Sequence, residues 1–145
     1  MDELVTAMKI VLANTYAMYF KAHGFHWNVE GKDFSQLHEF FGNIYEEVFA
    51  AADTIAEEIR ALDAFAPYGM QTLADIATIK DSAIYGNSVP SMLSDLISAN
   101  SAVIEALNSA HKLAEAEGNN GLLNLLEERL DVHAKHAWML RATSR

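Results

Sequence analysis

The chain has 145 residues, of which 51% are hydrophobic, and this is enough for one domain with a packed core. It contains no cysteine, which excludes disulfides, thiolate metal sites and cysteine nucleophiles. Its formal net charge of -10 argues against broad attraction to nucleic acid and favours the attraction of cations. The acidic start MDEL does not resemble a secretory signal, and no apolar run approaches the ~20 residues of a membrane span. We therefore expect a cytoplasmic protein that does not associate with membranes.

The first half of the chain predicts two long helices. The first covers about residues 2–29, where apolar and histidine side chains recur every three or four residues, and Gly31 can end it. The second covers about residues 34–62 and keeps helical spacing without a break. Asp33 followed by Gln36 resembles a capping box at its start.

The second half predicts two more long helices. One covers about residues 90–117, with Pro90 in its first turn, where proline is favoured. The run GNNG at residues 118–121 breaks the chain, and the last helix covers about residues 122–141.

The lengths of the connections predict how these helices are arranged. Short links make the first and second helices, and likewise the third and fourth, antiparallel neighbours. Residues 63–89 are long enough to cross the whole bundle, and the run TLADIA within them predicts a short helix. Two hairpins joined by one long crossover are typical of a ferritin-like four-helix bundle. We expect an all-α protein with residues 1–145 in a single domain.

Histidines and carboxylates are the candidate metal ligands. The usual di-iron bundle carries two Glu-x-x-His pairs, but no glutamate lies three residues before any of the six histidines, which argues against an internal centre of that kind. The remaining candidates are His26, His38, Asp53 and Glu57. Asp53 and Glu57 are four residues apart, so their carboxylates stand on one helical face, which Glu46 and Gly42 continue toward the start of the helix.

Helix geometry limits how these four side chains can combine. His38 and Asp53 lie fifteen residues apart on one predicted helix, which corresponds to about 22 Å. Two ligands of one ion must lie within about 5 Å of each other. If all four bind one ion, the carboxylates must come from a second chain, and a two-fold dimer would then hold two equivalent sites. Such mixed ligands suit Fe(II), Mn(II) or Zn(II), and ligand type alone does not choose among these metals.

Three stretches resemble the Dps-type miniferritins. They are HGFHWNVEGKDFSQLHEFF at residues 23–41, DTIAEEIRAL at 53–62 and KHAWMLRA at 135–142. The resemblance implies a hollow homo-oligomer, a dodecamer, with ferroxidase sites at its two-fold interfaces. Fe(II) would be oxidised there by hydrogen peroxide, or by oxygen, and stored inside as ferric mineral. By the same resemblance, the iron ligands are His26, His38, Asp53 and Glu57, with Trp27 beside the site.

The sequence departs from that family in three places. Gly42 stands where the family usually has an acidic residue for a second iron, and Glu46, one turn later, is a candidate to compensate for it. The start of the last helix is poor in acids, although Glu127, Glu128 and Asp131 remain as candidates for an iron-entry pore. Lys9 is the only basic residue among the first twenty, so we expect weak or absent DNA binding.

Simpler interpretations stand beside these expectations. A structural role explains His23 as well as an outer role at the metal site does. Trp27 can be explained as an interface anchor. We expect His111, His133 and His136 to be packing or surface residues. The alternative function is a cage-forming structural or DNA-protecting protein of this type with weak or lost ferroxidase activity.

Overall fold

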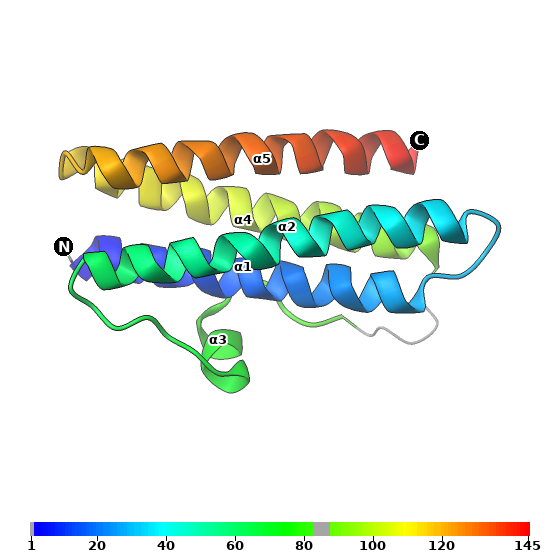
Figure 1. Ribbon diagram of the computed structural model, residues 1–145, viewed down its shortest axis with the longest axis horizontal. Coiled ribbons are helices and arrows are strands. Elements are labelled where there is room, and N and C mark those ends of the chain that lie inside the picture. Colours follow the sequence, from blue (N-terminus) through cyan, green and yellow to red (C-terminus); the bar gives the residue numbers. More distant parts are fainter. Residues whose placement is uncertain (1, 83–87) are drawn as a thin grey trace.

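Four long helices run side by side in the computed structural model, which describes residues 2–82 and 88–145 (Figure 1). They are α1 (Asp2–Asn28), α2 (Phe34–Ala61), α4 (Val89–Ala116) and α5 (Asn120–Ser144). A fifth, short helix, α3 (Met70–Ile76), lies on the crossover between α2 and α4. The predicted four-helix bundle, with a short helix in its long crossover, is confirmed. Residues 83–87 of the predicted crossover lie outside the described residues.

The caps of two helices match or correct the sequence prediction. Pro90 lies in the first turn of α4, as predicted, and the Ser88 hydroxyl accepts a hydrogen bond from the backbone N–H of Ser91. The predicted capping box of α2 is wrong, because the Asp33 side chain makes no capping hydrogen bond. Its backbone, at φ -101° and ψ 23°, is not in the extended conformation that directs a capping side chain at the first turn.

The last helix is longer than the sequence pattern predicts. Gly118, with φ +67°, follows the end of α4, and the Asn119 side chain accepts a hydrogen bond from the N–H of Leu122 at 3.1 Å. The break is therefore shorter than the whole GNNG run, and α5 begins at Asn120. Asn120 and Gly121 belong to the helix rather than to the turn.

The core fills the space between the helices. Close backbone contacts join α1 to α2, α4 to α5 and α1 to α4, whereas α2 and α5 lie farther apart. The largest fully buried side chains are Phe25, Phe41, Leu4, Met8, Leu12, Met18, Ile44, Ile55, Ile59, Met92, Leu96 and Leu107. Hydrophobic burial of these side chains stabilises the pairing of the two hairpins. The wider α2–α5 seam is bridged by longer polar side chains.

Two buried polar residues of α1 make contacts outside their own hairpin. The side-chain oxygen of Asn14 accepts from the N–H of Thr78 at 2.9 Å, and its amide nitrogen donates to the Thr78 hydroxyl at 2.8 Å. The ammonium of Lys21 lies 3.1 Å from a carboxylate oxygen of Asp95 on α4. These contacts fix the end of the α3 segment and α4 against α1.

No helix within the described residues combines the length and apolar character needed to cross a membrane.

Candidate metal centre

His26 and His38 are brought together where the α1–α2 hairpin closes. Their imidazole rings stack with centroids 3.7 Å apart and an angle of 15° between the planes. Nδ1 of His26 lies 2.6 Å from the backbone carbonyl oxygen of His38, and Nδ1 of His38 lies 2.7 Å from the carbonyl oxygen of His26. Each histidine therefore orients the other through its main chain.

This reciprocal pair fixes the tautomer of both rings. A carbonyl oxygen can only accept a hydrogen bond, so Nδ1 of each imidazole must carry the proton. The lone pair of each neutral ring then lies on Nε2, the atom available for a metal ion. Histidines that bind metals usually donate their other ring N–H in this way, which holds the ring in position. The sequence spacing indicated the two residues, but not these hydrogen bonds.

Gly42 lies directly against His26. A Cβ atom built on Gly42 would lie 3.0 Å from Nδ1 and 3.1 Å from Cε1 of the His26 ring. These separations are shorter than ordinary van der Waals contact, so the ring would have to shift by a few tenths of an ångström to admit any side chain. Gly42 stands where the resembling family usually has an acidic side chain, and it is also the position where the backbone of α2 closely approaches the His26 imidazole.

The candidate carboxylates lie farther along the same helix. Asp53, Glu57 and Glu46 are all exposed on α2, which is unbroken from Phe34 to Ala61. Across the described part of the chain, no three His, Asp or Glu side chains are grouped closely enough to hold one metal ion. One chain therefore supplies a pair of imidazoles and a separate pair of carboxylates, as the helix length predicted.

An aromatic cluster surrounds the imidazole pair. The His23 ring stacks on Tyr45, with centroids 4.1 Å apart, and contacts Trp27 at 4.0 Å. Nδ1 of His23 lies 3.0 Å from the Tyr19 hydroxyl. Burial, together with the charge of nearby His26, lowers the pKa of His23 and favours its neutral form. The Trp27 side chain is 64% exposed, so a large apolar surface lies open beside His26.

A second polar cluster lies inside the bundle, across the α2–α5 seam. The Arg129 guanidinium pairs with both carboxylate oxygens of Glu47, and its Nη2 atom lies 2.9 Å from Nε2 of His133. Nε2 of His136 lies 2.8 Å from Oε1 of Glu47. His133 donates from Nδ1 to the side-chain oxygen of Asn100 at 2.7 Å, and the Asn100 amide nitrogen donates to the His133 carbonyl oxygen.

This cluster confirms that His133 and His136 are packing residues and adds a partner for them. His133 and His136 are buried, and Glu47 is the acidic partner that local sequence did not reveal. Burial alone would raise the pKa of Glu47, but hydrogen bonds from His136 and Arg129 outweigh it and lower that pKa to about 2. Burial, with the charges of Arg129 and His136, lowers the pKa of His133 to about 3, so this imidazole stays neutral at ordinary pH.

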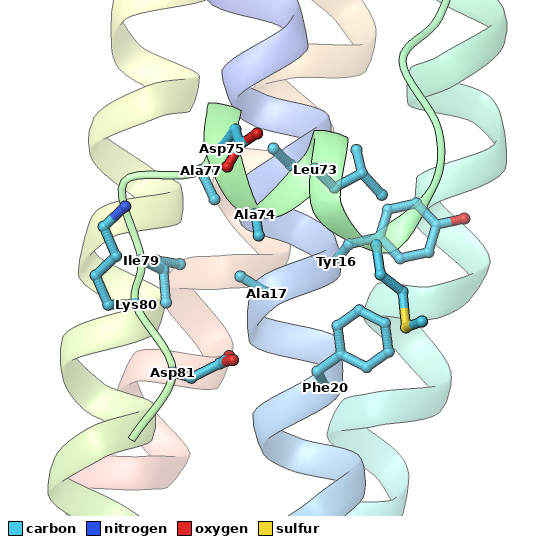
Figure 2. Close-up of a pocket in the computed structure, with 12 residues that line it drawn as sticks. Tyr16, Ala17, Phe20, Leu73, Ala74, Asp75, Ala77, Ile79, Lys80 and Asp81 are labelled. Atoms are coloured by element: carbon cyan, nitrogen blue, oxygen red, sulfur yellow. The ribbon is translucent and has the colours of Figure 1, made fainter. Parts of the chain in front are cut away.

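A surface hollow beside α3 is separate from both clusters. Its lining comes from residues 13–20 of α1 and residues 70–81, and Figure 2 shows Tyr16 and Phe20 of α1 beside Leu73 of α3. Most of its lining is apolar, with Asp75, Lys80 and Asp81 along the crossover. It contains none of the four candidate ligands.

The fold and the histidine pair define a class of protein that comparison with known families confirms. The family model described as "Ferritin-like domain" matches residues 5–145, so the chain belongs to the ferritin-like family. A Brevibacillus brevis protein named "DNA protection during starvation protein" is 32% identical over 131 residues, which cover 90% of this chain and 87% of that protein. Within the ferritin-like family, the chain is a Dps-type miniferritin, as the sequence resemblance predicted.

Two further relatives agree with this placement. "General stress protein 20U" of Bacillus subtilis is 32% identical over 145 residues, covering 97% of both chains. The crystal structure of the Dps protein from Vibrio cholerae O1 superimposes with a TM-score of 0.94 at 28% identity, covering 99% of this chain and 90% of that one. That protein is described as a member of a broad superfamily of ferritin-like diiron-carboxylate proteins.

Proposed function

We propose that this protein stores and detoxifies iron, acting as a ferroxidase at sites shared between two subunits. Fe(II) is the substrate, and His26 and His38 of one subunit bind it together with Asp53 and Glu57 of another. Trp27 lies beside each site, and Glu46 is an additional candidate ligand. The ferric product is held as mineral inside a hollow homo-oligomer, for which the family resemblance favours a dodecamer. Zn(II) or Mn(II) would compete for the same ligands.

One observation carries this proposal: the reciprocal hydrogen bonds between His26 and His38. These bonds require the proton on Nδ1 of both rings, so they present two Nε2 lone pairs from one hairpin. Two imidazoles alone leave a divalent ion short of ligands and of negative charge. The exposed carboxylates of Asp53 and Glu57 supply both, provided that they come from a second chain.

Exposed aromatic side chains support a subunit interface around this site. Trp27 is 64% exposed, Phe49 is 51% exposed and Phe20 is 48% exposed, and they belong to α1 and α2, the helices that carry the candidate ligands. Aromatic residues are enriched in buried interfaces relative to the rest of the protein surface. An antiparallel partner on this face would cover these rings and bring its carboxylates to the imidazoles.

The proposed oxidation balances with peroxide as the acceptor. Two Fe(II) ions each give up one electron, and one hydrogen peroxide molecule takes both electrons and two protons to form two water molecules. Because Gly42 lacks the acidic side chain for a second iron, we expect one well-defined iron position per site. The two electrons then come from two Fe(II) ions bound at different sites or in succession. The protein contributes ligands and position to this reaction, and the mineral cavity removes the ferric product.

A complementation experiment tests whether the site is shared. One variant carries His26→Ala and His38→Ala, and the other carries Asp53→Ala and Glu57→Ala. Each pure variant is expected to oxidise Fe(II) at the background rate after an anaerobic load and a peroxide pulse. In a mixed two-fold dimer, one site loses all four ligands and the other keeps all four. Random reassembly of equal amounts should therefore restore about a quarter of the wild-type sites.

The matched control is Glu39→Ala, which removes another exposed carboxylate of α2 and should keep wild-type activity. Ferric absorbance and particle mass are followed together, so that loss of assembly is distinguished from loss of chemistry. Activity in either pure variant, or no recovery in a mixture that has formed mixed particles, would contradict the shared site.

A second candidate function rests on Gly42. The missing side chain leaves one fewer acidic ligand, which favours a cage that assembles but oxidises iron poorly. That alternative would be established if peroxide oxidised Fe(II) no faster in the wild-type particle than in the His38→Ala, Asp53→Ala double variant.

DNA protection, which the name of the Brevibacillus relative describes, is not favoured here because a net charge of -10 opposes phosphate contacts.

A further inference from the structure

The polar cluster in the α2–α5 seam has the composition of a metal site with an arginine inside it. Two imidazoles and one carboxylate form a three-ligand set that binds Zn(II) with a fourth position open. Here those groups are His133, His136 and Glu47, and they are placed by two different helices. Nη2 of Arg129 lies 2.9 Å from Nε2 of His133 and 3.0 Å from Oε1 of Glu47.

We propose that Arg129 is a resident cation that closes a latent His–His–carboxylate metal site inside the bundle. Its guanidinium takes the place of a divalent ion among His133, His136 and Glu47. The interior is thereby closed to iron and zinc, and metal chemistry is left to other parts of the molecule. This inference does not depend on the proposed ferroxidase activity.

The hydrogen bonds of His133 already match those of a metal ligand. Its Nδ1 donates to the Asn100 side-chain oxygen, whose orientation is fixed because the Asn100 amide nitrogen donates to the His133 carbonyl oxygen. Nε2 therefore carries the lone pair and accepts a hydrogen bond from Arg129. Metal-binding histidines use this arrangement, with one nitrogen held by an outer partner and the other at the ion.

Two buried atoms indicate that the arginine is not perfectly accommodated. Within the part of the chain that the structure describes, Nε of Arg129 and Nδ1 of His136 have no hydrogen-bond partner, although both residues are more than nine-tenths buried. Most buried polar atoms in proteins are paired. Since Nδ1 of His136 makes no bond, moving its proton from Nε2 to Nδ1 to bind a metal would break no existing contact at Nδ1.

Two of the three donors need only a small adjustment to reach a metal ion. Zinc bonds to imidazole and carboxylate are close to 2.1 Å, whereas Nε2 of His133 and Oε1 of Glu47 lie 2.9 Å and 3.0 Å from Nη2, so these two atoms would move inward by about 0.8 to 0.9 Å. Nε2 of His136 already lies 2.8 Å from the same Glu47 oxygen. In the present geometry, no three metal-ligating side chains among the described residues are grouped closely enough to hold an ion. Binding of a metal ion would therefore require His133, His136 and Glu47 to move closer together once the guanidinium is removed.

The test compares the wild type with variants at Arg129 and His133, with Co(II) as a visible probe. Arg129→Ala removes the resident cation, whereas Arg129→Lys keeps a positive charge on a similar stem. We expect Arg129→Ala to bind roughly one more Co(II) per chain than the wild type, with the intense visible bands of a low-coordinate ion. Arg129→Lys should bind no more than the wild type. Adding His133→Ala to Arg129→Ala should abolish the extra ion.

Folding provides the second readout, because Arg129→Ala removes the two hydrogen bonds from the guanidinium to Glu47. We expect Zn(II) to raise the thermal midpoint of Arg129→Ala, or to restore its helical circular dichroism if the variant is unfolded without metal. Zn(II) should not do this for the Arg129→Ala, His133→Ala variant. A folded Arg129→Ala protein that takes up no extra Co(II), or an unfolded one that Zn(II) does not restore, would overturn the inference. So would Co(II) binding by the wild type that His133→Ala removes.

Discussion

Glu47→Gln tests how strongly the seam cluster joins the two helical hairpins. Glutamine keeps the length and shape of the side chain but removes the negative charge that faces Arg129 and His136. Arg129 would then remain buried without a carboxylate partner. Breaking a buried ion pair by removing one partner is strongly destabilising, because the remaining charge is left uncompensated.

The pKa of Glu47 sets the size of the expected effect. It falls from 4.5 to about 2, and at about 1.4 kcal/mol for each pH unit this corresponds to about 3 kcal/mol. The Glu47 side chain is 33% exposed, so solvent screening reduces this value. We expect the free energy of unfolding at pH 7 to fall by about 2 kcal/mol in Glu47→Gln.

Urea unfolding at a fixed protein concentration measures this difference, since the stability of an oligomer depends on concentration. A carboxylate with a lowered pKa stabilises the fold fully above its unfolded pKa and loses that contribution as the pH falls toward its folded pKa. The gap between wild type and Glu47→Gln should therefore be constant from pH 7 to about pH 5 and shrink between about pH 4.5 and pH 2.

Glu39→Gln is the matched control, because Glu39 is an exposed glutamate of the same helix. It should change the free energy of unfolding by less than about 0.5 kcal/mol. If Glu47→Gln is as stable as this control at pH 7, or if the gap between Glu47→Gln and wild type widens on acidification, the electrostatic account of the seam is wrong.

Three further predictions concern the hairpin, the crossover and nucleic acid. Gly42→Ala should weaken Co(II) binding at the imidazole pair by about tenfold in a titration, because the new Cβ displaces His26. The control Gly24→Ala, which has open space around its Cβ, should leave the Co(II) affinity unchanged. Equal affinity in the two variants would contradict the close approach. Asn14→Ala should lower the free energy of unfolding by about 2 kcal/mol, because it removes the hydrogen bonds of the buried Asn14 amide to Thr78. Urea unfolding that shows wild-type stability would refute this. Finally, no gel shift of duplex DNA is expected at physiological salt, and a shift there would show phosphate contacts despite the net charge of -10.

The sequence predicted the bundle well because its helices depend on local patterns. Apolar spacing and the short links indicated four helices in two hairpins, and TLADIA indicated the short helix α3. Helix ends were harder to predict, since they depend on individual hydrogen bonds. Asp33 fits a capping box in sequence but not in backbone angle, and the Asn119 side chain caps α5 within a run that reads only as a break.

The two polar clusters show the same division between local and long-range information. His26 and His38 could be selected from the sequence because each lies beside recognisable neighbours. Glu47 could not be assigned to His136, because 89 residues separate them and neither has a local signature. A search for Glu-x-x-His pairs passes over this cluster, since its carboxylate comes from another helix. Only the packing of α2 against α5 brings the groups together.

The mutual hydrogen bonds of His26 and His38 place the imidazole half of the proposed site within a single hairpin. Each imidazole is held by main-chain atoms only twelve residues away, so this half is formed as soon as α1 and α2 pair. In an assembly built as proposed, docking of a second subunit would supply carboxylates without having to reshape the imidazoles. The number of complete sites would then equal the number of correctly formed subunit contacts. The geometry of each imidazole pair would be set by the folded hairpin alone.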